Sequence, residues 1–176
     1  MSDLQIREAG SEDIELLAAT GQRLFIDTYG KISGAEDLAA HVDDYFSERA
    51  VAMELGRRGA RYLLAIDGQA IVGFLKLRQD QVPKSVPAVN ALEVQQLYVS
   101  ADQQRRGIGR RLMDKAVDVA RELSVQGLWL SVWEEADWAI LFYRHYGYQT
   151  VGTTDFWLGD SHYNDFLMWF PADADH

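Results

Sequence analysis

The chain has 176 residues, a length typical of one domain, with 48% hydrophobic and 25% charged residues, as in an ordinary globular protein. It has no cysteine, which excludes disulfides and thiolate metal sites, and its four histidines lack metal-ligand spacing, so we expect no metal. The net charge of -10 argues against nucleic acid as a partner, because phosphate contacts need a basic surface.

The N-terminal segment is polar and acidic and lacks the apolar core of a signal peptide. No apolar run approaches the roughly 20 residues that span a bilayer, so we expect a cytoplasmic protein without membrane contact. No repeat or linker divides the chain. We therefore expect a single domain over residues 1–171 and a frayed tail over 172–176.

The first half predicts a short strand, helices and a hairpin. A strand at Leu4–Arg7 is followed by a helix with Ser11 as its N-cap. One or two short helices follow, ended by Gly59. Next come two β-rich runs around Asp67-Gly68, which predict a hairpin with a type I′ turn. Residues 80–90 contain two prolines and predict a mobile loop.

The second half alternates strands with helices and ends in two strands. The expected elements are a strand at 91–99, a helix at 107–123, a strand at 127–133, a helix at 136–147, and strands at 148–158 and 162–170. The strand–helix–strand unit in the middle implies a right-handed crossover and a parallel pair inside a mixed sheet.

The turn between residues 99 and 108 gathers positive charge in an acidic protein. The segment from Gln104 to Lys115 carries a net charge of +4, and Gly107 and Gly109 permit close approach to the backbone. A helix N-terminus disfavours cations, so the arrangement predicts a bound anion. The alternatives are a solvated basic face and a dinucleotide site, but Leu112 replaces the third glycine of the dinucleotide pattern.

The pattern Gln104-x-x-Gly107-x-Gly109, after a strand ending in Leu-Tyr-Val, resembles the acetyl-CoA motif of the GNAT superfamily of N-acetyltransferases. The resemblance implies an α/β GNAT fold, with a mixed central sheet of about six or seven strands flanked by helices and with splayed central parallel strands. It also implies acetyl-CoA as the acetyl donor. The residues implied to bind it are Leu97, Tyr98, Val99, Gln104, Arg105, Arg106, Gly107, Ile108, Gly109, Arg110 and Tyr143.

The strand before this turn changes its apolar phase. Leu92 and Val94 alternate with polar residues, but the next apolar pair is Leu97 and Val99, one position out of step. A β-bulge near Gln95-Gln96 would restore the phase, although a strand buried on both faces gives the same pattern. In GNAT enzymes a bulge here separates two parallel strands around the pantetheine arm.

Three groups are implied by the resemblance to carry the chemistry. Glu93 matches a general base that acts directly or through water, and the backbone N–H of Leu97 matches the donor to the acetyl carbonyl. Tyr143, in the GNAT-like helix "WAILFYRHYGY", matches the tyrosine that protonates the leaving thiolate. Ala136 replaces the usual asparagine of the family, which puts one cofactor hydrogen bond in doubt.

The ending "FWLGDSHYNDFLMWF" resembles that of bacterial PaiA-type polyamine N-acetyltransferases, with Phe156, Leu158, Gly159, Asp165 and Met168 on the pattern. We therefore expect direct attack by a primary amine in a ternary complex, with a polyamine such as spermidine as acceptor. A peptide N-terminus, a lysine side chain and an aminoglycoside are alternative acceptors. A homodimer is left open.

Acidic residues in the first helices could attract a polycation, or could form a solvated face. They are Asp27, Glu36, Asp37, Asp43 and Asp44. Two alternatives from other functional classes stay open: an acyl-CoA-binding sensor module of GNAT fold without turnover, and a nucleotide-dependent oxidoreductase.

Overall fold

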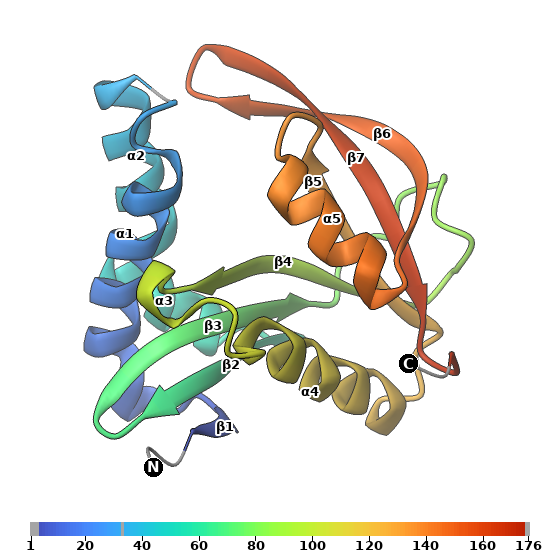
Figure 1. Cartoon of the computed structure of the whole chain (residues 1–176), viewed down its shortest axis with the longest axis horizontal. Coiled ribbons are helices and arrows are strands. Elements are labelled where there is room, and N and C mark those ends of the chain that lie inside the picture. The colour runs from blue at the N-terminus through green and yellow to red at the C-terminus, as the bar shows by residue number, and fades with distance from the viewer. Residues whose placement is uncertain (1–3, 33, 175–176) are drawn as a thin grey trace.

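A seven-stranded mixed sheet with helices on both faces forms the body of the protein (Figure 1). The computed structural model describes residues 4–32 and 34–174. The elements are β1 (Gln5–Glu8), α1 (Ile14–Tyr29), α2 (Ala35–Phe46), α3 (Glu48–Leu55), β2 (Ala60–Asp67), β3 (Ala70–Arg78), β4 (Leu92–Val99), α4 (Ile108–Glu122), β5 (Gly127–Trp133), α5 (Asp137–Tyr146), β6 (Gln149–Leu158) and β7 (Ser161–Pro171). The strand order is β1-β2-β3-β4-β5-β7-β6, and the expected mixed α/β architecture is confirmed.

Side chains that alternate along the strands build a separate core on each face of the sheet. The core on one face includes Leu75, Leu92 and Leu130 and is covered by α4 and α5. The core on the other face includes Tyr62 and Phe74 and is covered by α1, α2 and α3. Most of β3 and the first four residues of β5 are buried, which explains their nearly continuous apolar sequences.

The two central strands, β4 and β5, are parallel and separate soon after they begin. They pair only at Leu92 with Leu128 and at Glu93 with Trp129. The register of β4 against β3 shifts so that Gln95 is an extra residue, which is the bulge expected from the apolar phase. In Figure 1, β4 diverges from β5 and from the β6–β7 hairpin beyond this point. The expected splaying of the central strands is confirmed.

Three local predictions about turns and caps are wrong. Ser11 begins a 3-10 turn, and the Asp13 carboxylate accepts the Gly10 N–H at 2.8 Å, so the start of the first helix is organised by Asp13. The third helix ends at Gly56, well before Gly59. In the hairpin only Gly68 has positive φ, whereas a type I′ turn requires positive φ at both central residues.

Two segments that were expected to be loose are packed. The proline-containing loop buries Val86 in a small core with Trp129 and Trp169, so it covers the sheet instead of standing free. Beyond β7, the Ala172 N–H donates to the Gln126 carbonyl at 2.9 Å, and the Ala172 carbonyl accepts from Arg121. The chain is therefore held beyond residue 171, while residues 175–176 of the expected tail lie outside the described residues.

Candidate active site

The glycine turn before α4 presents open backbone at the start of the helix. Gly107 is the N-cap of α4 with φ of 73°, and Arg105 also has positive φ, at 66°. A Cβ added at Gly107 would meet no atom within 4 Å, so the space above this backbone is clear. Successive N–H groups in such a turn, next to a helix N-terminus, form a concave site for an anion.

Buried neighbours hold the turn in place. Ile108 is 1% exposed and anchors the start of α4 in the core, so only its backbone can serve a ligand. Gly109 packs against Phe142 of α5, where an added Cβ would lie 3.2 Å from the ring. The Gln104 amide lies 3.4 Å from the Val99 carbonyl and ties the turn to the end of β4. Gln104 and Gly109 therefore have structural roles in the turn.

The arginines of the turn are not all directed at one point. Arg106 forms an ion pair with Asp67 of the β2–β3 hairpin at 3.1 Å, and Arg111 donates to the Leu4 carbonyl at 2.8 Å. Arg110 is exposed and lies over the Tyr146 ring, 5.9 Å from its centroid, and Arg105 is also exposed. Arg105 and Arg110 are thus the residues best placed to neutralise phosphates at the turn.

Three tyrosines from different elements lie close enough to interact electrostatically. They are Tyr29 on α1, Tyr98 on β4 and Tyr143 on α5. Burial raises the pKa of both Tyr98 and Tyr143, and Tyr29 raises both further, which places it near each of them. Their hydroxyls are therefore protonated at neutral pH and can donate. No local sequence pattern assigns a role to Tyr29, because its electrostatic effect on Tyr98 and Tyr143 arises only in the tertiary structure.

The remaining predicted residues of β4 divide between the two faces of the strand. Leu97 and Val99 pack toward the α4–α5 core, whereas Tyr98 packs with Phe25 and Phe46 on the other face. Glu93 is half-buried opposite Arg78 of β3. Burial raises the pKa of Glu93, and Arg78 opposes that shift. A carboxylate with a raised pKa is suited to proton transfer near neutral pH.

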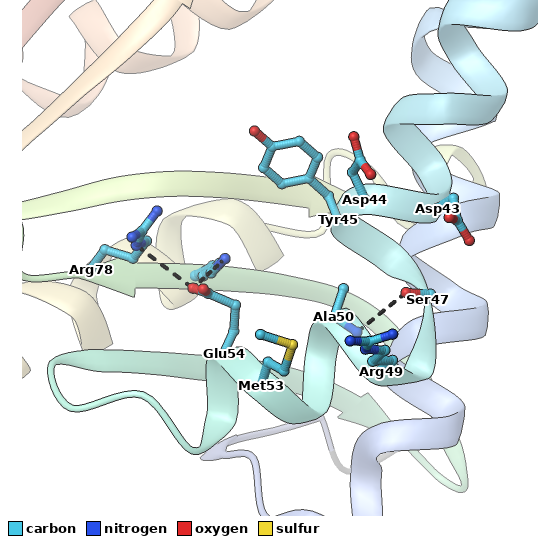
Figure 2. A pocket seen from close by; sticks show the side chains of 10 residues that line it. Asp43, Asp44, Tyr45, Ser47, Arg49, Ala50, Met53, Glu54 and Arg78 are labelled. Carbon is cyan, nitrogen blue, oxygen red and sulfur yellow. Dashed lines mark hydrogen bonds and ion pairs between the residues drawn. The ribbon is translucent and has the colours of Figure 1, made fainter.

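A cavity of about 370 Å³ opens between α2, α3 and β3 (Figure 2). Acidic side chains line it (Asp43, Asp44 and Glu54), together with three cations, Arg49, Lys76 and Arg78. Lys76 is 2% exposed, and its ammonium lies 2.8 Å from the Glu54 carboxylate. Two of the five acidic residues singled out in the sequence thus face this cavity, whereas Asp27 forms an ion pair with Arg23 and Asp37 lies beside Ser161.

Replacing Glu54 by glutamine should destabilise the fold by about 3 kcal/mol, because it leaves the buried Lys76 ammonium without its carboxylate. Burial opposes ionisation of Glu54, but Lys76, Arg78 and Arg57 together lower the pKa of Glu54. The ionised Glu54 therefore stabilises the fold at pH values above the pKa that it has in the unfolded chain. This stabilisation is lost as the pH falls through the lower pKa that Glu54 has in the folded protein. Urea unfolding should show the deficit at pH 7 and a smaller one at pH 4. The exposed Glu48→Gln variant on the same helix should unfold like the wild type, and an equal effect of both changes would contradict the assignment.

The acetyltransferase (GNAT) family model matches residues 23–148 of the chain. The chain belongs to this family. An uncharacterised N-acetyltransferase of Lactobacillus delbrueckii subsp. lactis is 32% identical over 169 residues, covering 96% of this chain and 97% of the relative. The N-alpha-acetyltransferase RimI of Mycobacterium tuberculosis is 33% identical over 111 residues, covering 62% of this chain and 65% of RimI.

Solved structures of this family share the fold. The PaiA N-acetyltransferase of Thermoplasma acidophilum, crystallised with coenzyme A, superimposes with a TM-score of 0.77, 20% sequence identity, and coverage of 96% of this chain and 99% of that one. The GNAT fold expected from the sequence is thus confirmed, and the protein is an acetyl-CoA-dependent N-acetyltransferase. The dinucleotide interpretation of the glycine turn is replaced by this assignment.

Within residues 4–32 and 34–174, no group of His, Asp or Glu side chains is placed to hold a metal ion. In the same part of the chain, no helix combines the length and apolarity needed to cross a membrane.

Proposed function

We propose that this GNAT enzyme transfers the acetyl group of acetyl-CoA to a primary alkylamine by direct attack in a ternary complex. One observation carries the proposal: β4 and β5 separate beyond Glu93, and the glycine turn follows at the end of β4. A pantetheine arm anchored at the turn would lie along the free edge of β4 and bring its thioester to the bulge. PaiA-type enzymes are the subgroup that we favour.

The residues at the turn fit the pyrophosphate of acetyl-CoA. The clear space above Gly107 admits the phosphate oxygens to the backbone N–H groups of residues 107–109. Arg105 and Arg110 add positive charge, and the backbone of residues 97–99 borders the opening between the strands. Ala136, which stands where the family usually has asparagine, is the N-cap of α5 and provides no side-chain hydrogen bond there.

Acetyl-CoA supplies the activated acetyl group, and three groups of the chain would assist its transfer. Glu93 receives a proton from the acceptor ammonium through water, since burial has raised its pKa. The Leu97 N–H stabilises the charge on the carbonyl oxygen. The Tyr143 hydroxyl gives its proton to the departing sulfur. The C–N bond forms as the C–S bond breaks, and the second proton of the attacking nitrogen passes through water to the Tyr143 oxygen, which restores the hydroxyl that protonated the sulfur.

A polyamine such as spermidine is the acceptor that we favour. The first support is the PaiA-like C-terminal sequence, and the second is the pair of exposed carboxylates, Asp43 and Asp44, at the α2 side of the cavity. The cations Arg49, Lys76 and Arg78 in the same wall also suit a peptide, whose N-terminal amine is accompanied by carbonyl groups. The partial similarity to RimI, named as an N-alpha-acetyltransferase, makes a peptide N-terminus the second candidate.

An amine panel with thiol detection tests this function. Purified protein is supplied with acetyl-CoA and with spermidine, n-butylamine or a peptide that begins with alanine, and free CoA is measured over time. We expect amine-dependent CoA release, with spermidine giving a higher kcat/KM than the peptide. Tight acetyl-CoA binding by calorimetry, with no CoA release for any amine, would instead support the sensor module.

A further inference from the structure

Asp165 is a buried carboxylate for which the mechanism above has no use. It lies on β7, opposite Trp133 of β5 and Thr154 of β6, and is only 5% exposed. Its Oδ1 atom is fully buried, and within the described part of the chain it has no hydrogen-bond partner. A buried polar atom without a partner is costly and rare in folded proteins, so its presence requires an explanation.

The surroundings of Asp165 add negative charge and hydroxyl groups. The pKa of Asp165 is raised to about 6, chiefly by burial and further by Glu134, while a hydrogen bond from the Ser131 hydroxyl acts in the opposite direction. Asp165 in turn raises the pKa of Tyr29 on α1, so this tyrosine lies within the range of the Asp165 charge. Among residues 4–32 and 34–174, no lysine, arginine or histidine is found acting on the Asp165 carboxylate. The site therefore lacks the cation that a buried carboxylate normally pairs with.

Asp165 also lies beside an opening in the sheet. Ser131 is exposed although the four residues before it on β5 and the one after it are buried. This exposure occurs two residues beyond Trp129, where the pairing of β4 with β5 has ended. The terminal torsion of an aspartate is broad, so either carboxylate oxygen can turn toward a group that enters beside Ser131.

We propose that the Asp165 carboxylate, with the Ser131 hydroxyl beside it, binds the ammonium group of the acceptor amine. The inference rests on the proposed function and adds a specificity-determining residue to it. A primary ammonium carries one positive charge and three donors, which matches the two oxygens of one carboxylate and the oxygen of the Ser131 hydroxyl. An acceptor that is positively charged before reaction is thereby preferred over a neutral amine such as an arylamine.

Calorimetry with spermidine, in the presence of saturating CoA, tests the proposal without turnover. Asp165→Asn should weaken spermidine binding at least tenfold and leave CoA binding unchanged. The wild-type affinity should also fall as the pH is lowered through about 6, because protonation removes the charge of Asp165, and this loss should be absent in the variant. Glu134 and Tyr29 are the other titratable groups near the site. Both are present in the wild type and in Asp165→Asn, so subtracting the pH dependence of spermidine affinity in the variant from that in the wild type removes their contribution.

Two further variants keep the test decisive. Asp155→Asn removes an exposed carboxylate on the neighbouring strand β6 and should bind spermidine like the wild type. Ser131→Ala keeps the charge of Asp165 and should move the midpoint of the pH dependence upward. Unchanged spermidine affinity in Asp165→Asn, with CoA binding intact, would overturn the proposal. Spermidine binding through Asp165 without CoA release in the amine panel would contradict the proposed function and leave this inference standing.

Discussion

Tyr143→Phe should lower kcat by about 100-fold, the lower end of the range for a lost general acid, with little change in acetyl-CoA affinity. Burial raises the pKa of the Tyr143 hydroxyl, so this group is protonated in the free enzyme and can donate. The substitution removes one oxygen from α5 and keeps the ring contacts with Phe142 and Tyr148. Only the proton transfer to the departing thiolate should be lost.

The neighbouring Tyr148 provides a matched control for this prediction. Its hydroxyl is also buried and has no hydrogen-bond partner in the part of the chain that is described, and its ring lies 5.5 Å from that of Tyr143. Tyr148→Phe should therefore leave kcat unchanged. Single-turnover CoA release measures the chemical step, and calorimetry measures acetyl-CoA binding for both variants. Equal rates for Tyr143→Phe and Tyr148→Phe would remove the acid role from Tyr143.

Gly107→Ala should weaken acetyl-CoA binding by at least tenfold, or about 1.4 kcal/mol. The φ of 73° at Gly107 is unfavourable for a residue with a Cβ, which costs roughly 1–2 kcal/mol and turns the backbone away from its present conformation. The added methyl group would also occupy the clear space through which a phosphate reaches the N–H groups. Binding and stability should therefore both decrease.

Gly68 in the β2–β3 hairpin separates these two effects. Its φ is 65°, and an added Cβ there would also meet nothing within 4 Å. Gly68→Ala should lower stability to urea as much as Gly107→Ala does, and should bind acetyl-CoA with wild-type affinity. If both variants lost the same affinity, a general loss of structure would explain the result and the turn would not be the pyrophosphate site.

Features of the site that depend on neighbours in sequence could be predicted from the sequence alone. Gly107, Gly109 and the charges around them identify the turn, because backbone freedom and helix-end chemistry act over a few residues. The change of apolar phase between Val94 and Leu97 predicted the bulge, because the two-residue period of a strand makes an extra residue visible. The seven strands and their order along the chain follow from the same local patterns.

Other features depend on which side chains the fold brings together, and only the tertiary structure decided them. Arg106 belongs to the basic turn by sequence but is paired with Asp67, 39 residues away. The loop before β4 contains prolines that suggest mobility, yet burial of Val86 fixes it on the sheet. Asp165 matches a sequence pattern, but its missing hydrogen-bond partner and its electrostatic effect on Tyr29 arise only in the folded protein. The burial of a side chain and the charge that it pairs with depend on contacts between residues distant in sequence, so no local sequence pattern predicts them.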